Sequence, residues 1–330
     1  CPKLEALQQL LKKRKESNQE YCRTVLDVIE VGEMKGVKQI SITVDNRNHQ
    51  TMSLVHPCLA QAQGPALVIC FHDISLEVDE VIRLTSPAKY YSRTTSGGGG
   101  GGGSGFPRYG RGLCGTFSMT DCLQVVTGSS FLIFDPSGQY LIEDKTKTNN
   151  NEEANSVADE KKKTEKAYAR NYGLSHAFCQ QFPDQFDPFL SLNVGLEESL
   201  VNGEHSPSGP YFRGTIIRLP LRTADGPTKT IASSIFCKSN IEKMSSSLEE
   251  ALPKSVLFSY NLQSISLDIW NPLEDTCERI LSSRISSSPL TRREHFDVQI
   301  DTKSWRKEKN KLNKLFKSSW SPKRGFIIVQ

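Results

Sequence analysis

Helical periodicity marks the first 34 residues of the chain. Apolar side chains recur at the three- and four-residue spacing of a helix face, at Leu4, Leu7, Leu10 and Leu11 and again at Val25, Leu26, Val28 and Ile29. This spacing predicts two amphipathic helices, each with one apolar face that can be buried in a core.

Patterns typical of β-strands follow these helices. Residues 38–45 alternate apolar and polar side chains, and residues 64–73 form a continuous apolar run bounded by turn residues, as in a buried strand. Further strands are predicted at 211–222, 256–270, 294–301 and 324–330, helices at 77–84 and 239–252, and a hairpin at 129–144 around the turn Asp135–Gly138. This mixture predicts an α+β sandwich, a mixed sheet with helices on one face.

Two low-complexity segments interrupt the predicted elements. Residues 97–105 contain seven consecutive glycines, and residues 145–166 consist mainly of blocks of charged and polar side chains. A polyglycine run has no preferred geometry, and a segment without apolar residues cannot offset the entropy of ordering. We therefore expect both segments to be exposed, disordered insertions and not phosphate-binding loops.

Composition limits the class of protein. The chain has 330 residues, of which 37% are hydrophobic and 24% are charged, with a net charge of +4. Its nine cysteines form no C-x-x-C pair, so neither a zinc site nor a disulfide framework is predicted, and a reducing compartment is expected, cytoplasmic or alternatively nuclear. No apolar stretch has the length of a membrane span, and no signal peptide is present at the start. Because the first residue is Cys1, we expect a piece of a longer protein.

Four segments carry a more specific pattern. They are DVIEVGEMKGVK (27–38), GPALVICFHDISLEVDE (64–80), YGRGLCGTFSMTDCLQVVTG (109–128) and GTIIRLPLR (214–222). In order and spacing they resemble the nucleotide-binding region of the Sacsin/Nov domain, and QFPDQFDPFL (181–190) resembles a further segment of that region. The resemblance implies a Bergerat-type (GHKL) two-layer sandwich, the ATP-binding fold of heat-shock chaperones, DNA gyrase, MutL and histidine kinases. It divides the chain into a nucleotide-binding domain, residues 1–240, and a C-terminal α/β extension of the same module, residues 241–330.

The resemblance also implies that the catalytic helix is degenerate. Asp27 takes the place of the family's water-activating Glu, with a side chain shorter by about 1.5 Å, a displacement that can cost about a hundredfold in rate. Val31 replaces the Asn that holds magnesium, and Met34 replaces a second acid. Magnesium requires oxygen ligands, which valine does not offer. We therefore expect no catalytic residue and no metal site on this helix.

Other matching positions are candidates for nucleotide binding. They are Asp73, Lys89, Gly110, Gly112 and Thr215. The resemblance implies that Asp73 accepts a hydrogen bond from an adenine amino group, that the two glycines contact phosphate, and that Thr215 lies at the floor of the adenine pocket, close to both Asp27 and Asp73. Simpler interpretations stay open, because Asp73 could be a turn residue at a strand end. Arg218 could likewise be a charge on an edge strand.

Three functions are compatible with these residues. The favoured one is a chaperone-type interaction module with a degenerate ATP pocket, which binds a client or co-chaperone protein and for which ATP and magnesium are doubtful ligands. A working magnesium-dependent ATPase is the first alternative, if Glu30 or Glu33 supplies the missing ligand. The second is a nucleic-acid-associated protein, supported only by the basic stretch 302–324 with Trp305, Phe316 and Trp320. No membrane partner is expected.

Limited proteolysis tests this organisation. We expect the first cleavage to fall within residues 145–166, because an insertion that lacks apolar residues should be accessible to a protease. Mass spectrometry of the early fragments locates the cleavage. Protection of this segment together with early cleavage inside residues 64–73 would show that the predicted organisation is wrong.

Overall fold

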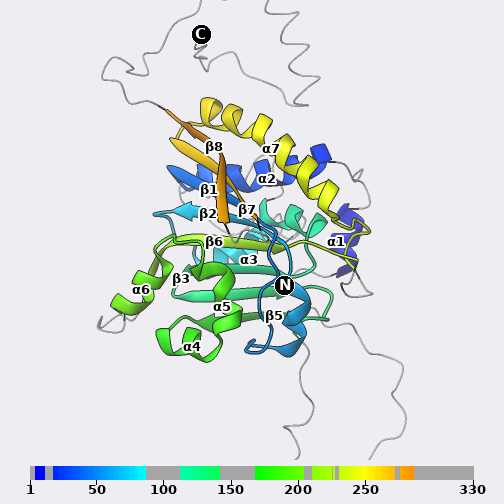
Figure 1. The fold of residues 1–330 in the computed structure, drawn as a ribbon, viewed down its shortest axis with the longest axis vertical. Helices are drawn as coiled ribbons and strands as arrows, with labels where there is room; N and C mark the ends of the chain where they lie inside the picture. Colours follow the sequence, from blue (N-terminus) through cyan, green and yellow to red (C-terminus); the bar gives the residue numbers. More distant parts are fainter. Residues whose placement is uncertain are drawn as a thin grey trace, which may run out of the picture. The chain divides into compact units, whose positions relative to one another are not determined.

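Figure 1 shows the helices and strands of the computed structural model, which describes residues 4–11, 18–86, 112–141, 168–203, 210–224, 226, 230–271 and 276–285. Several expectations lie outside these residues: the two low-complexity segments, Lys89, Gly110, the basic stretch 302–324 and the strands predicted at 294–301 and 324–330. None of the helices in the described part is both long enough and apolar enough to cross a membrane.

Seven α-helices and two 3-10 helices are described. The α-helices are α1 (Leu4–Leu11), α2 (Asn18–Met34), α3 (Val78–Leu84), α4 (His176–Gln181), α5 (Pro183–Leu190), α6 (Leu196–Gly203) and α7 (Lys238–Phe258). The 3-10 helices are η1 (Pro57–Ala62) and η3 (Gly112–Ser118). The first two helices lie where the apolar periodicity predicts them.

The strands form one sheet of eight in the order β5-β4-β3-β6-β2-β1-β7-β8. They are β1 (Gln39–Asp45), β2 (Ala66–His72), β3 (Leu123–Gly128), β4 (Ser130–Asp135), β5 (Tyr168–Gly173), β6 (Phe212–Pro220), β7 (Ser264–Asn271) and β8 (Thr276–Arg284). Neighbouring strands are antiparallel except β1 and β7, which are parallel. The predicted α+β class with a mixed sheet is confirmed.

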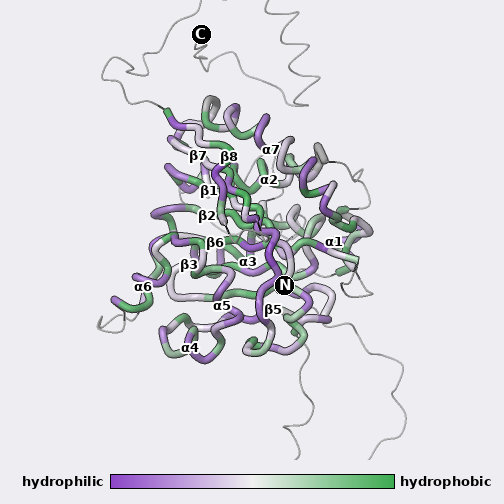
Figure 2. The backbone as a smooth tube through the Cα atoms, in the orientation of Figure 1, coloured by the Kyte–Doolittle hydropathy of each residue, from purple (hydrophilic) through white to green (hydrophobic). Residues whose placement is uncertain are grey.

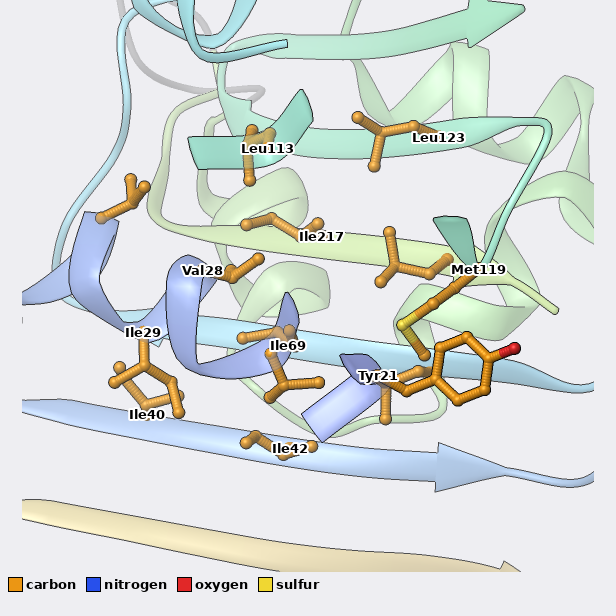
Figure 3. Packing of buried hydrophobic residues seen from close by; sticks show 14 of the residues in the cluster. Tyr21, Val28, Ile29, Ile40, Ile42, Ile69, Leu113, Met119, Leu123 and Ile217 are labelled. Atoms are coloured by element: carbon orange, nitrogen blue, oxygen red, sulfur yellow. The ribbon is translucent and has the colours of Figure 1, made fainter. Parts of the chain in front are cut away.

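The main helical layer covers one face of the sheet. Helices α1, α2, α3, η3 and α7 contribute to a single hydrophobic cluster with apolar side chains from β1, β2, β3, β4, β6 and β7. Figure 3 shows Val28 and Ile29 of α2 facing Ile40 of β1, Ile69 of β2 and Ile217 of β6. This layer is the one that the sequence predicts.

A smaller layer lies on the opposite face of the sheet. Helices η1, α4, α5 and α6 share a second hydrophobic cluster with side chains of β2, β3, β4 and β6. The central strands are therefore buried on both faces, which explains why β2 reads as an unbroken apolar run and is mostly green in Figure 2. None of the four helices in this layer was predicted from the sequence.

The predicted hairpin is right in its first strand, which is β4, and in its turn, but its second strand does not form over the described residues up to 141. The amide of Gly138 donates to the carbonyl of Asp135, as in the predicted turn. The Asp135 carboxylate, however, also accepts hydrogen bonds from the amides of Tyr140 and Leu141, at 2.7 and 2.9 Å, so these amides are not available to a strand partner. Instead β4 pairs with β3 on one side and β5 on the other.

The C-terminal part of the described chain belongs to the same sheet and core. The predicted boundary between residues 240 and 241 falls within the first turn of α7. Helix α7 packs into the main hydrophobic cluster, and β7 pairs with β1. The strand predicted at 256–270 begins only at Ser264, because α7 continues to Phe258.

Glu33 at the end of α2 fixes the connection from α7 to β7. Its carboxylate accepts hydrogen bonds from the backbone amides of Tyr260, Asn261 and Leu262, and its carbonyl accepts one from the side chain of Asn261. One charged side chain thus satisfies three amides that follow a helix, and it couples the N-terminal helices to the C-terminal strands.

Replacing Glu33 with Gln should destabilise this connection. The variant keeps the shape of the side chain but retains only one acceptor oxygen and no charge, so the free energy of unfolding should fall by about 1–3 kcal/mol. Urea denaturation measures the change. Glu249→Gln on the exposed side of α7 is the control and should change stability by no more than about 0.5 kcal/mol. Equal effects of the two substitutions would show that the three amide contacts contribute little.

Candidate functional site

Helix α2 places Asp27 and Val31 one turn apart on its buried side. Asp27 is 7% exposed and Val31 is fully buried. Val31 is a member of the main hydrophobic cluster, together with Val28 and Ile29. The position where the resemblance expects a metal-binding amide therefore carries an apolar side chain inside the core.

The two glutamates proposed as replacement ligands lie in different surroundings. Burial raises the pKa of Glu30, and the negative charge of Asp27 three residues earlier raises it further. Glu33 is bound to the backbone of residues 260–262, as described above. The carboxylate of Glu30 therefore interacts electrostatically with Asp27, whereas that of Glu33 is held by backbone amides.

The end of β2 brings Asp73 beside β6. Asp73 follows the last residue of β2 and adopts a left-handed backbone conformation with φ of 61°. Phe71, two residues earlier, lies opposite Thr215 on β6. Asp73 is exposed, as a residue that accepts a hydrogen bond from a ligand must be. The structure therefore places the loop that carries Asp73 next to Thr215.

The hydroxyl group of Thr215 forms hydrogen bonds within the protein. Thr215 is buried, and its Oγ1 donates to the carbonyl of Ile74 and accepts from the amide of Leu76, both at 3.0 Å. It also lies 3.0 Å from Oγ1 of Thr127 on β3, which donates to the carbonyl of Leu76. These bonds hold the loop after Asp73 against the sheet. A hydroxyl has one proton and two lone pairs, so Thr215 has no proton left to donate to a ligand and could only accept a hydrogen bond.

Helix α2 adjoins this loop through a close contact. Gly32, directly after Val31, lies against the ring of Phe71, where an added Cβ atom would come within 3.1 Å of the ring. Phe71 is in turn the partner of Thr215 in the sheet. The elements that carry Asp27, Asp73 and Thr215 thus meet around Phe71. The expectation that these three side chains line one pocket stays a prediction.

The segment after the glycine-rich run packs as a buried 3-10 helix. Every residue of η3 is buried, and Thr24 of α2 lies 3.5 Å from Ser118 between their hydroxyl oxygens. Gly112, a candidate for phosphate contact, has a φ of 55° and no room for a side chain, because an added Cβ would lie 3.2 Å from the carbonyl of Leu84. Glycine is therefore required at this position for backbone reasons alone.

Two matching charged residues of the pattern form a buried ion pair. The guanidinium of Arg222 donates to both carboxylate oxygens of Asp121, at 2.8 and 2.9 Å. It also donates to the carbonyls of Phe117 and Ser118 at the end of η3 and to Ser234. No role was predicted for this pair from the sequence. Its contacts show that it holds the end of η3 in place.

The edge-strand interpretation of Arg218 is wrong. Strand β6 lies between β2 and β3 in the interior of the sheet, and Arg218 is fully buried. Burial lowers the pKa of this guanidinium to about 10, which leaves it charged at neutral pH. Arg218 is therefore a buried cation on the face of the smaller helical layer.

A comparison with known protein families gives a match to this sequence. The sequence model of the Sacsin domain family matches residues 24–282, which span α2 to β8 and well over half of the chain. No curated protein matches the chain. Among the residues that the structure describes, no group of three or more His, Cys, Asp or Glu side chains is arranged to hold a metal ion.

A second polar cluster, which the sequence analysis missed, lies at the end of β1. Arg47 donates to both oxygens of Asp45, at 2.9 and 2.8 Å, and its guanidinium lies 3.5 Å from the ring centre of Trp270. The imidazole of His49 contacts Asp45 at 3.0 Å and Asp187 of α5 at 2.7 Å. The segment at the end of β1 thus links β1 to β7 and to the smaller helical layer.

Asp45 should make the stability of the protein depend on pH in the acid range. Burial alone would raise its pKa, but the bonds from Arg47 and His49 hold the pKa of this carboxyl well below its usual range. Its contribution to stability is therefore complete above the usual aspartate pKa of about 4, and it is lost as the pH falls towards the lower folded-state pKa.

Asp45→Asn should remove this dependence. We expect the variant to be less stable than the wild type by about 3 kcal/mol at pH 7, and the difference to shrink below about pH 4. Urea denaturation at a series of pH values measures both effects. Asp79→Asn, at an exposed position of α3, is the control. A difference between wild type and Asp45→Asn that stays constant from pH 7 to pH 3 would contradict this assignment.

Proposed function

The chain belongs to the Sacsin domain family, and we propose that it is a chaperone-type interaction module whose ATP pocket is degenerate and does not hydrolyse nucleotide. Its partner would be a client or co-chaperone protein. The proposal concerns the chemistry of the pocket, because shared fold and family membership do not by themselves fix activity.

The observation that carries the proposal is the burial of Val31 in the core. Hydrolysis in this fold requires a carboxylate that positions water and a magnesium ion that neutralises the phosphates. Asp27 could supply the carboxylate, but Val31 is fully buried among apolar side chains and offers no oxygen ligand. Without an oxygen ligand at position 31, the metal that neutralises the phosphates would have to be held by other residues.

The adenine side of the pocket supports the same proposal. The Thr215 hydroxyl donates its only proton to the carbonyl of Ile74, so donating to an adenine base would require breaking a bond that holds the loop. Asp73 is exposed and could still accept a hydrogen bond from a ligand. Weak nucleotide binding without catalysis is therefore the most that these contacts favour.

A magnesium-dependent ATPase is the alternative, and Glu30 is the observation that favours it. Its carboxylate interacts electrostatically with Asp27, and two neighbouring carboxylates on one helix can jointly attract a divalent cation. Binding of magnesium to this pair would substitute for the missing Asn. The nucleic-acid alternative has no support among the described residues, because the basic stretch lies outside them.

A thermal-shift titration and an ATPase assay test the proposal together. The wild-type chain should show no magnesium-dependent ATP hydrolysis above background, and ATP with magnesium should raise its melting temperature little, since only a ligand that binds the folded state stabilises it. The triple variant Asp27→Glu, Val31→Asn and Met34→Asp restores the acidic and amide groups of the family's helix, and it should gain magnesium-dependent ATP binding.

Single substitutions provide the controls. Val31→Asn alone should gain little binding and should melt at a lower temperature, because it buries an amide in an apolar core. Hydrolysis by the wild type that disappears in Asp27→Ala would refute the degenerate pocket. Loss of magnesium binding in Glu30→Gln would then identify Glu30 as the replacement ligand.

A further inference from the structure

Arg218 is a buried cation whose hydrogen bonds to the described residues do not use its Nε atom. Its Nη1 donates to the carbonyl of Ala62 at 2.7 Å and lies 3.4 Å from Oε1 of Gln124, and its Nη2 donates to the carbonyl of Gly64 at 3.2 Å. Among the described residues, its Nε has no hydrogen-bond partner although it is buried. An unpaired buried donor is costly, so its surroundings call for an explanation.

Two glutamines next to Arg218 have the same property. Gln63 lies between Ala62 and Gly64, the residues whose carbonyls bind Arg218, and its Nε2 donates to the carbonyl of Asp184 at 3.3 Å. Gln185 follows Asp184 in α5 and is fully buried. Within the described part of the chain, the buried side-chain atoms without a partner are Arg218 Nε, Gln63 Oε1, Gln185 Oε1 and Gln185 Nε2.

The contacts of their neighbours place these three residues in one region of the fold. Arg218 donates hydrogen bonds to the carbonyls that precede and follow Gln63. The side chain of Gln63 donates to the carbonyl of the residue before Gln185. All three residues lie where β6, the end of η1 and the start of α5 adjoin, on the sheet face of the smaller helical layer. The four buried atoms without a partner in the described part of the chain therefore come from three residues in this region.

We propose that these four atoms form an internal binding site for a small neutral polar molecule, and that its occupant is water. The set contains two donors, Arg218 Nε and Gln185 Nε2, and two acceptors, the Oε1 atoms of Gln63 and Gln185. An anion could use only the donors and would leave two acceptors unpaired. Water accepts two hydrogen bonds and donates two, so it satisfies all four atoms.

The site has a mechanical role in the fold. Water held by Arg218, Gln63 and Gln185 joins a central strand, the η1 loop and α5 through one molecule. It lies on the face opposite the main helical layer, so it is independent of the proposed nucleotide pocket. The proposal and the proposed function can therefore succeed or fail separately.

The sign of the stability change in Gln185→Leu tests the site. If water bridges the four atoms, the apolar side chain removes two of its partners and strands the other two, so the folding equilibrium constant should fall by about 10- to 100-fold. If Gln185 is unpaired, the same substitution removes two orphan atoms and the constant should rise. An unchanged or increased constant in urea denaturation overturns the proposal.

A matched control and a direct observation complete the test. Gln180→Leu replaces an exposed glutamine of α4 and should change the constant by no more than about twofold. A high-resolution crystal structure of the wild-type chain should show a density peak within hydrogen-bond distance of at least three of the four atoms, even if the variant fails to fold. No peak at this position, or an anomalous signal there after a bromide soak, overturns the assignment to water.

Discussion

The buried ion pair between Arg222 and Asp121 is the constraint on which the candidate site depends. Each charge is almost fully buried, and burying two charges is tolerated only when their remaining donors and acceptors are also paired. The carbonyls of Phe117 and Ser118 complete this pairing, so the pair holds the end of η3 against the end of β6. Because η3 packs beside α2, the ion pair also supports the position of α2 without contacting any ligand.

Several residues that the family pattern marks are therefore required for folding. Thr215 holds the loop after Asp73, Gly112 adopts a left-handed backbone beside Leu84, and Arg222 anchors η3. A chain that never bound nucleotide would still need all three. Their structural roles are consistent with the family's fold being kept. Under the proposed function the chemistry depends instead on α2, where Val31 departs from the pattern. Motif matches at structural positions and at chemical positions are thus different kinds of evidence.

The sequence predicts the elements whose own pattern determines them. Helix α2 and strands β1, β2 and β6 were predicted because their apolar spacing is local. Strands β5 and β8 were missed, since both carry charged residues such as Arg170 and Arg279 and gain strand structure from pairing with β4 and β7. The contacts of the candidate site were equally hidden, because Glu33 binds residues more than 220 positions later. Only the assembled sheet brings these groups together.

Under the proposed function, position 31 has two requirements that conflict. A side chain at this position can complete the apolar packing between α2 and the sheet, or it can offer an oxygen to a metal, but it cannot do both. Exchanging an amide for valine in a buried position removes the cost of burying a polar group, so it adds stability while it removes a ligand. A module that acts by holding a partner gains from that exchange and loses nothing it uses. The same substitution in a hydrolysing member would remove its activity. The identity of residue 31 therefore carries more functional information than the glycines that match the pattern.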